Sequence, residues 1–399
     1  MSSPFETTRQ RFKLPEGVVY LDGNSLGPTP RSASARLRQL VEDEWGQLLI
    51  RAWNQAGWME QPRHVGDRIG RLIGAAAGSV AVGDTLSIKI YQALDAALGL
   101  QPDRRVVLSD RGNFPGDLYM AEGLLRSRGS DYRLKLVEPE DVGGAIDSSV
   151  AALMLTQVDY RSGRLHDMQG LTQLAHCFDV PVIWDLAHSA GAMPIDLAGC
   201  DADFAAGCTY KYLNGGPGSP AFIYVAPRLQ DAVQPALAGW LGHAQPFDFD
   251  LDYRPAPGVE RMRVGTPPVL AMSVLDAALG VWDGVNMEDV RRESIELSEM
   301  FIREVESHCP MLTLASPRDP AQRGSQVSFH FEHSYAVIQA LIHRHQVIGD
   351  FRAPDIMRFA FCPLYLSREA VLRGAQAIAL VLRDSEWDDP KFAIRADVT

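Results

Sequence analysis

Residues 181–218 read PVIWDLAHSAGAMPIDLAGCDADFAAGCTYKYLNGGPG, and this stretch decides the fold class. It contains two mainly apolar runs, Pro181–Leu186 and Asp203–Cys208, in which apolar and polar residues do not alternate. Such runs are typical of strands that are covered on both faces. Each is followed by small residues and glycines that indicate a loop. We therefore predict an α/β protein with a mainly parallel central sheet covered by helices.

The flanking sequence extends this pattern in both directions. Further apolar runs at Arg105–Ser109, Ala151–Thr156 and Pro220–Val225 predict additional strands. Stretches with helical periodicity at Gly116–Arg128 and Met168–Phe178 lie between the runs. Alternation of strands and helices is typical of parallel sheets, because each crossover carries a helix.

The pattern changes near residue 285. A long amphipathic helix is predicted at Met287–His308, and shorter strands follow at Gln326–Phe331 and Met357–Phe361. A last helix is predicted at about Ser367–Asp384. The predicted division is an arm and a helix (about Arg31–Leu49) in residues 1–50 that join the small domain, a large α/β domain in residues 51–284 and a smaller α+β domain in residues 285–399.

Composition excludes several classes of function. The formal net charge of −12 disfavours a nucleic-acid partner. No apolar run approaches the ~20 residues that span a bilayer, and no apolar segment near the start resembles a secretory signal, so we expect a cytoplasmic protein without membrane contact. The five cysteines form no CxxC pair, which predicts reduced, buried thiols and no metal site. They are Cys177, Cys200, Cys208, Cys309 and Cys362.

Two charged residues follow the apolar runs of the opening stretch. Asp185 ends the first run, and a carboxylate buried there requires a cation or several donors. Lys211 follows the second run and precedes a glycine-rich turn, a position that suits a Schiff-base amine. Taken alone, Asp185 would fit a helix cap better, and Lys211 would usually be an exposed loop lysine. Together at the carboxyl edge of one sheet they fit pyridoxal 5′-phosphate (PLP), whose pyridinium nitrogen is a suitable cation for Asp185.

Two further segments fit a phosphorylated, planar cofactor. Asp84–Ile88 opens a predicted helix that runs to about Leu100, and free N–H groups at a helix start bind phosphate. Ordinary N-capping is the alternative for this segment. Phe114, on the turn Asn113–Asp117, could lie against a flat ring, or it could belong to the core.

Six motifs in order resemble the kynureninase family, PLP enzymes of fold type I in the aminotransferase class V group, along nearly the whole chain. They are Tyr20–Pro28, Phe114–Asp117, Asp185–His188, Tyr210–Asn214, Arg263–Pro268 and Arg358–Tyr365.

The resemblance implies a role for each matching cofactor residue. Lys211 would hold PLP as a Schiff base, Asp185 would pair with the pyridine nitrogen, and His188 would lie near the 3′-oxygen. Phe114 would stack on the ring. Further contacts are implied for Asp117 and Thr156 with the cofactor and for Leu86, Ser87, Tyr210, Trp240 and Thr266 with its phosphate. Trp240 and Thr266 are expected from a partner subunit, which implies a homodimer with shared active sites.

The resemblance also implies substrate contacts. Arg358 matches the arginine that binds the α-carboxylate, and its planar fork suits that group. A salt bridge on an exposed strand is the alternative, which the apolar neighbours of Arg358 disfavour. Asn24 and Trp58 lie in segments expected to fold over the substrate. Thr266 replaces an asparagine of animal and fungal relatives, which predicts a preference for kynurenine over 3-hydroxykynurenine.

The implied reaction is hydrolysis of L-kynurenine to anthranilate and L-alanine, in tryptophan breakdown or NAD precursor supply. Lys211 would move the Cα proton, Tyr210 would donate or relay a proton at Cβ, and Asp185 would complete the catalytic set. Lys89, at a helix position where a neutral residue is expected, is predicted to be solvated and without function.

Other classes remain open at this point. A cysteine desulfurase or an aminotransferase of the same group is the nearest alternative, although Cys309 and Cys362 do not lie in glycine- or serine-rich loops. A PLP-fold protein that only binds or regulates would lack the lysine. A metal enzyme is disfavoured because His343 and His345 are two residues apart in a predicted helix and point away from each other.

Overall fold

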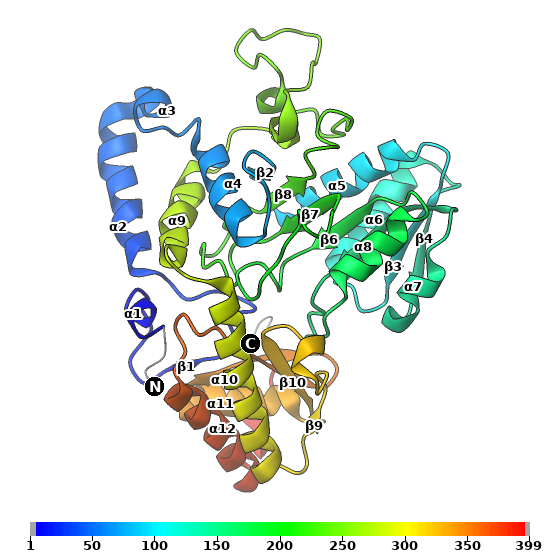
Figure 1. Ribbon diagram of the computed structural model, residues 1–399. Coiled ribbons are helices and arrows are strands. Elements are labelled where there is room, and N and C mark those ends of the chain that lie inside the picture. Colours follow the sequence, from blue (N-terminus) through cyan, green and yellow to red (C-terminus); the bar gives the residue numbers. More distant parts are fainter. Residues whose placement is uncertain (1–4, 396–399) are drawn as a thin grey trace.

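A seven-stranded sheet forms the centre of the chain in the computed structural model, which describes residues 5–395 (Figure 1). Its strand order is β2-β8-β7-β6-β5-β3-β4. The strands are β2 (Val80–Val82), β3 (Val106–Asp110), β4 (Arg133–Val137), β5 (Val150–Thr156), β6 (Val182–Asp185), β7 (Phe204–Gly207) and β8 (Phe222–Val225). Strands β3 to β7 are parallel, whereas β8 is antiparallel to β7 and to β2. The predicted mainly parallel sheet is confirmed.

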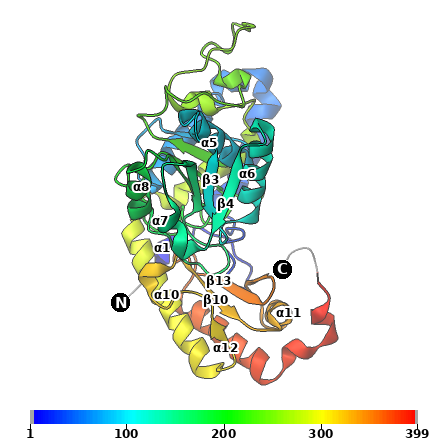
Figure 2. The same cartoon turned by 90° about the vertical axis from the view of Figure 1, so that its right-hand side faces the viewer.

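Helices cover both faces of this sheet, which explains why its strands are apolar throughout. Figure 2 shows α6 (Pro115–Arg128) on one side of β3 and β4 and α8 (Met168–His176) on the other. Along β6, Ile183 packs into the core beneath α5 (Leu86–Leu100), while Trp184 packs into the core on the opposite face.

A second, smaller set of strands lies in the C-terminal part. Its antiparallel sheet has the order β12-β13-β10-β9, and α10, α11 and α12 pack around it (Figure 2). The strands are β9 (Thr313–Leu314), β10 (Gln326–His330), β12 (Asp350–Arg352) and β13 (Ile356–Ala360), and the helices are α10 (Met287–His308), α11 (Ser334–His345) and α12 (Arg368–Arg383). The expected smaller α+β part is present.

The N-terminal segment contacts both parts. Strand β1 (Val19–Tyr20) pairs in parallel with β11 (Val347–Ile348) and so joins the C-terminal strands. The helix predicted at residues 31–49 is α2 (Arg31–Gln39), continued as a π-helix to Leu48. It packs against α9 (Val269–Leu279) rather than on the small sheet, contrary to the expectation for this helix. The domain boundaries stay a prediction, and residues 1–4 and 396–399 of the predicted end domains lie outside the described residues.

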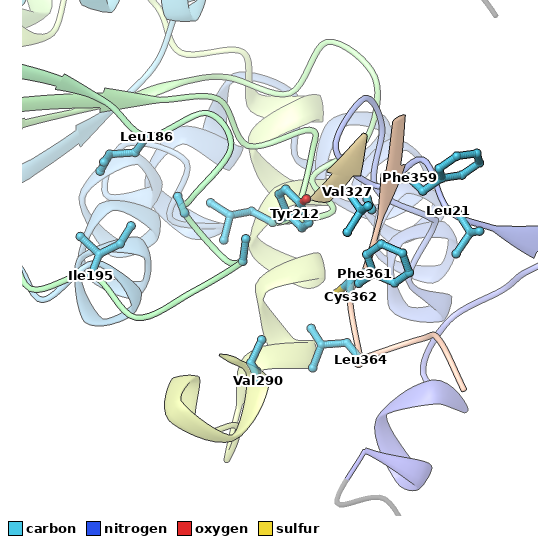
Figure 3. Close-up of a cluster of buried hydrophobic side chains, with 14 of the residues drawn as sticks. Leu21, Leu186, Ile195, Tyr212, Val290, Val327, Phe359, Phe361, Cys362 and Leu364 are labelled. Carbon is cyan, nitrogen blue, oxygen red and sulfur yellow. The ribbon is translucent and has the colours of Figure 1, made fainter. Parts of the chain in front are cut away.

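One apolar core connects the large sheet to the C-terminal part. Figure 3 shows Tyr212, from the loop after β7, beside Val327 of β10, with Phe359 of β13 and Leu21 of the arm close by. Burial of side chains of this size stabilises the fold by roughly 1.5–3 kcal/mol each. The loop that carries Lys211 is therefore held between the two sheets.

Two sequence-based expectations can be compared with the fold. All five cysteines are free, but Cys177 is exposed and Cys200 is only half-buried, so the prediction of buried thiols holds for the other three alone. Within residues 5–395, no single helix is long and apolar enough to cross a bilayer, and only the bent pair Val269–Trp282 and Met287–His308, which meet at 81°, passes by length and composition.

Candidate active site

The carboxyl ends of the parallel strands bring the predicted cofactor residues to one edge of the sheet. Thr156 ends β5 and lies in register with Asp185 at the end of β6. Asp185 is in turn paired with Ala206 of β7, the strand that leads to Lys211. Adjacent strand ends place these side chains together, as predicted.

Asp185 is a buried carboxylate with several partners. Its Oδ1 accepts a hydrogen bond from the Ala187 N–H at 2.8 Å, and the Thr156 hydroxyl lies 3.2 Å from Oδ2. Residues 187–192 form turns, and no helix lies between β6 and β7 in the described chain, so the helix-cap alternative is wrong. Burial raises the pKa of Asp185, and the charge of Lys211 opposes that rise.

Asp117 is a second buried carboxyl group at this edge. Burial, and then the charge of Asp185, raise the pKa of Asp117 well above its ordinary value. We infer that Asp117 carries the proton of this pair and that Asp185 carries the negative charge, because Lys211 and the donors around Asp185 favour its ionised form.

Lys211 is partly buried and contacts a histidine. Its Nζ lies 2.9 Å from Nε2 of His188. Burial, and then the charge of Lys211, lower the pKa of His188 well below its usual value, so the imidazole is neutral and can accept a hydrogen bond from the amine. The alternative of a solvated loop lysine is wrong.

The arm fixes the backbone at this lysine. The Gly27 N–H donates to the Tyr210 carbonyl at 2.8 Å, and a Cβ on Gly27 would lie 2.2 Å from the Lys211 carbonyl oxygen. Only glycine allows this approach, which accounts for the glycine of the Tyr20–Pro28 motif.

Two aromatic residues border the same edge. Phe114, directly before α6, is 44% exposed and is therefore not a core residue. Its ring packs edge-on against Tyr160 at 5.3 Å between centroids. Tyr210 is partly buried, and its pKa is raised by the neighbouring Cys208 thiol and by burial. The phenol of Tyr210 therefore keeps its proton.

The predicted phosphate seat has the expected helix start. Helix α5 begins at Leu86, and within residues 5–395 the side chain of its N-cap residue Thr85 makes no capping hydrogen bond. Backbone N–H groups of Leu86 and Ser87 belong to the first turn and lack partners within the helix. Because β2 runs parallel to β7, this helix start lies at the same edge as Lys211.

Lys89 differs from its prediction. It is only 1% exposed, and its Nζ contacts Asp84 at 3.1 Å, Gln92 at 2.9 Å and the Met262 carbonyl at 3.3 Å. The expectation of a solvated side chain is wrong because these partners compensate the cost of burying the ammonium group. Lys89 lines a narrow cleft together with Asp84 and Thr266.

The two tryptophans predicted for the site, Trp240 and Trp58, make local contacts in this chain. Trp240 is partly exposed and packs edge-on against Phe247 at 5.7 Å. Trp58 is buried, donates from Nε1 to Glu44 at 2.7 Å and packs against Trp53. The structure gives both tryptophans these local contacts, and their cofactor and substrate roles stay predictions.

Arg358 and Asn24 lie in the interior between the arm and the C-terminal sheet. Asn24 is buried, with Nδ2 3.5 Å from Oε1 of Gln326. Arg358 is buried on β13, so the alternative of a salt bridge on an exposed strand is wrong, although the arginine does pair with Asp350. The sequence analysis missed Asp350, and the available signal was that an arginine in an apolar strand needs a buried anion.

Comparison with known proteins identifies the family. A kynureninase from Burkholderia pseudomallei (strain 1106a) is 48% identical over 99% of this chain and 97% of its own length. One from Pseudomonas fluorescens is 48% identical over 98% of this chain and 95% of its own length. A family model described as the kynureninase C-terminal domain matches residues 290–378.

The chain belongs to the kynureninase family. It is accordingly a PLP-dependent enzyme of fold type I and a hydrolase of carbon–carbon bonds.

Solved structures agree on the fold of this kynureninase-family chain. An apo cysteine desulfurase from Thermococcus onnurineus NA1 has a TM-score of 0.81 at 18% identity and covers 96% of this chain and 99% of its own. The desulfurase CsdA from Escherichia coli has a TM-score of 0.78 at 19% identity, with the same coverage. At these identities the likeness concerns the fold alone.

The unsatisfied atoms of the site fit a polar, planar cofactor. Among the residues that the structure describes, buried side-chain atoms without a hydrogen-bond partner include Asp117 Oδ2, Gln157 Oε1 and His188 Nδ1. Buried polar atoms are nearly always paired in folded proteins, so three such atoms at one strand edge indicate a ligand. The residues present therefore suit the PLP of kynureninases, with Asp185 as the anion.

Proposed function

We propose that this chain hydrolyses the Cβ–Cγ bond of L-kynurenine to give anthranilate and L-alanine, as a step of tryptophan catabolism. The observation that carries the proposal is the contact of 2.9 Å between Lys211 Nζ and His188 Nε2 beside the buried carboxylate of Asp185. PLP, when bound, supplies an electron sink for negative charge at Cα and Cβ of the amino acid.

Lys211 is the proposed acid–base group at Cα. Neutral His188 accepts a hydrogen bond from the amine and so orients it without adding a competing positive charge. An amine held in this way can remove and return the Cα proton, which is the task that the reaction sets. The ionised Asp185 favours a protonated pyridine nitrogen, because it is the buried anion on this side of the site.

Tyr210 is the proposed proton donor or relay at Cβ. Its pKa is raised, so the phenol is protonated at neutral pH and is ready to give a proton. It precedes Lys211 directly in the chain, in a loop that the arm holds through Gly27. Water adds to the ketone carbon Cγ, and the Cβ–Cγ bond then breaks with its electron pair left on Cβ, so that anthranilate leaves. The proton from Tyr210 goes to Cβ and completes the methyl group of alanine.

We assign substrate binding to Arg358, Asn24 and Trp58, with Arg358 on the α-carboxylate. Arg358 contacts the Tyr160 carbonyl, and Asn24 contacts the Gln326 side chain, which donates to the same carbonyl at 3.1 Å. We propose that Thr266 favours kynurenine over 3-hydroxykynurenine as the substrate.

A homodimer with shared sites forms part of the proposal, with Trp240 and Thr266 supplied by the partner. An exposed apolar stripe on α2 and the turns after it supports an additional interface. Its members are Leu37, Val41, Trp45 and Leu49, each four residues after the one before, and Ile50, which follows Leu49 directly. The cytoplasm is the proposed compartment, and the free cysteines are in keeping with a reducing environment.

Desulfurase activity is the second candidate, because the fold neighbours named above are desulfurases. Such an enzyme needs a thiolate that can reach the substrate. Cys309 and Cys362 are buried, and burial raises their pKa values to about 11 and about 12. Both thiols are therefore protonated and enclosed, which argues against Cys309 and Cys362 as the nucleophile of a desulfurase.

The deciding experiment adds L-kynurenine to the purified holoenzyme and follows anthranilate fluorescence together with alanine. We expect anthranilate and alanine in equal amounts. Sulfide release from L-cysteine is measured in parallel. Sulfide without anthranilate would refute the proposal in favour of the second candidate, and a bound cofactor with neither product would refute the substrate.

A further inference from the structure

A buried ionic cluster lies where the arm meets the C-terminal sheet. Asp350 on β12 and Arg358 on β13 are direct cross-strand partners. Arg358 donates from Nε to Asp350 Oδ1 at 2.7 Å, and its Nη2 contacts Oδ2 of the same carboxylate. This two-point contact fixes the plane of the guanidinium group.

Most N–H groups of Arg358 are already engaged. Besides Asp350, its Nη2 donates to Ser25 Oγ at 3.0 Å and its Nη1 donates to the Tyr160 carbonyl. A guanidinium group has five N–H donors, and these contacts use four of them. Arg358 alone therefore retains one donor for a substrate carboxylate, too few for a two-point contact.

A second arginine shares the same carboxylate. Arg352 Nη2 lies 2.9 Å from Asp350 Oδ2 and 3.3 Å from Ser25 Oγ. Unlike Asp350 and Arg358, which are each 1% exposed, the Arg352 side chain is 34% exposed. Its Nη1 donates to the Phe351 carbonyl at 2.8 Å, so the Nε–H and one Nη1 hydrogen are not used by these contacts.

The charges of this cluster do not cancel. Asp350 is the anion between the two arginines, and although burial opposes it, the charge of Arg358 keeps the pKa of Asp350 below its ordinary value. The nearby Asp22 is half-buried, and desolvation and the charge of Asp350 raise the pKa of its carboxyl group well above the ordinary range, which favours its neutral form. Two arginines and one carboxylate leave one positive charge in excess.

The cluster lies next to the candidate active site. The positive charges of Arg358 and Arg352 both act on His188, the partner of Lys211. Tyr160, whose carbonyl contacts Arg358, packs against Phe114 at the cofactor edge. A single carboxylate arriving from that side would balance the cluster.

We propose that Arg352 is a second recognition residue for the α-carboxylate of the substrate, which binds between Arg352 and the remaining N–H of Arg358. Asp350 acts as a positioning residue that holds both guanidinium groups. The inference rests on one part of the proposed function, namely that the substrate is an amino acid. Its ligand class is an α-amino acid with a free carboxylate.

The test compares a carboxylate with its uncharged amide. L-Alanine and L-alaninamide are titrated into the holoenzyme, and the change in cofactor absorbance gives both Kd values. In Arg352→Gln we expect the preference for L-alanine to fall about 10- to 100-fold, which is the range for one hydrogen bond to a charged group. Arg352→Lys keeps the charge and should retain most of the preference.

Arg161→Gln is the matched control, because Arg161 lies next to Tyr160 and only its ring contact with Tyr160 would be lost. It should keep the wild-type preference. An unchanged preference in Arg352→Gln, or an equal loss in Arg161→Gln, would overturn the inference. Because this titration requires no turnover, failure of the wild type to form anthranilate would refute the proposed function separately.

Discussion

The two edges of the seven-stranded sheet carry similar charged residues in different states. At the amino edge, Asp203 accepts from the Val182 N–H, from Arg228 and from His176, each at 2.8 Å. At the carboxyl edge, Asp117 and His188 each retain a buried atom without a partner among residues 5–395. Paired charges at the first edge stabilise the fold, whereas buried polar atoms without a partner at the second edge prepare the site for a ligand.

The largest expected effect is the replacement of Lys211. In Lys211→Ala we expect anthranilate formation to fall to background, because the amine that holds the cofactor and moves the Cα proton is lost. The fold should persist, since the Nζ hydrogen bond joins only His188. Lys135→Ala, at an exposed position on β4, should keep the wild-type rate in the same assay. Wild-type-like turnover by Lys211→Ala would contradict the whole scheme.

A smaller catalytic effect is expected at Tyr210. Tyr210→Phe should lower kcat by about 10²–10⁴-fold, the usual contribution of an acid–base group, and leave measurable turnover. Tyr212 is the control two residues further on, because its hydroxyl contacts the Ser325 carbonyl at 3.4 Å in the core. Tyr212→Phe should change kcat little. Equal losses in steady-state kcat would show that the loop, and not the phenol of Tyr210, is responsible.

Replacing Lys89 tests whether the difference between the two sheet edges depends on the hydrogen-bond partners of a charged residue or on its position in the sheet. It lies near the carboxyl edge but has three partners. Lys89→Met should therefore lower the free energy of unfolding by about 1–3 kcal/mol, as the Gln92 and Met262 oxygens lose their donor. Urea unfolding measures this change, and kcat per folded enzyme should stay constant. A loss of kcat without a loss of stability would place Lys89 in the active site.

The smallest effect is expected at the amino edge. The hydrogen bond with Asp203 raises the pKa of His176 against the opposing effect of burial. A raised folded-state pKa means that the pair contributes its full stability below the unfolded pKa of about 6.5 and loses it as the pH rises through the folded value. The measured quantity is the difference in free energy of unfolding between the wild type and His176→Asn. We expect this difference to be about 0.5–1 kcal/mol larger at pH 6 than at pH 9. A gap that widens with pH in urea unfolding would contradict this sign.

Much of the fold and part of the site could be predicted from the sequence, because both depend on local patterns. Strands apolar on both faces reveal a covered parallel sheet, and adjacent strand ends then bring Thr156, Asp185 and Lys211 together. In the sequence Gly27 is only one glycine within a motif, so its close approach to the Lys211 loop could not be predicted.

The remaining features depend on contacts between distant segments. Lys89 is buried because the Met262 carbonyl, 173 residues away in the chain, meets its ammonium group. Asp350 pairs with Arg358 through the register of β12 and β13, which no composition or periodicity determines. Trp58 was expected near the substrate, and its contact with Glu44 depends on how the segment after α2 folds back.

The most direct test of the central claim locates the cofactor on the chain. The holoenzyme is treated with sodium borohydride, which fixes PLP to the lysine that holds it, and the digested protein is analysed by mass spectrometry. We predict a single modified residue, Lys211, and no modification of the paired Lys89. Modification of another lysine, or none at all in a protein that contains PLP, would contradict the assignment of the carboxyl edge as the active site.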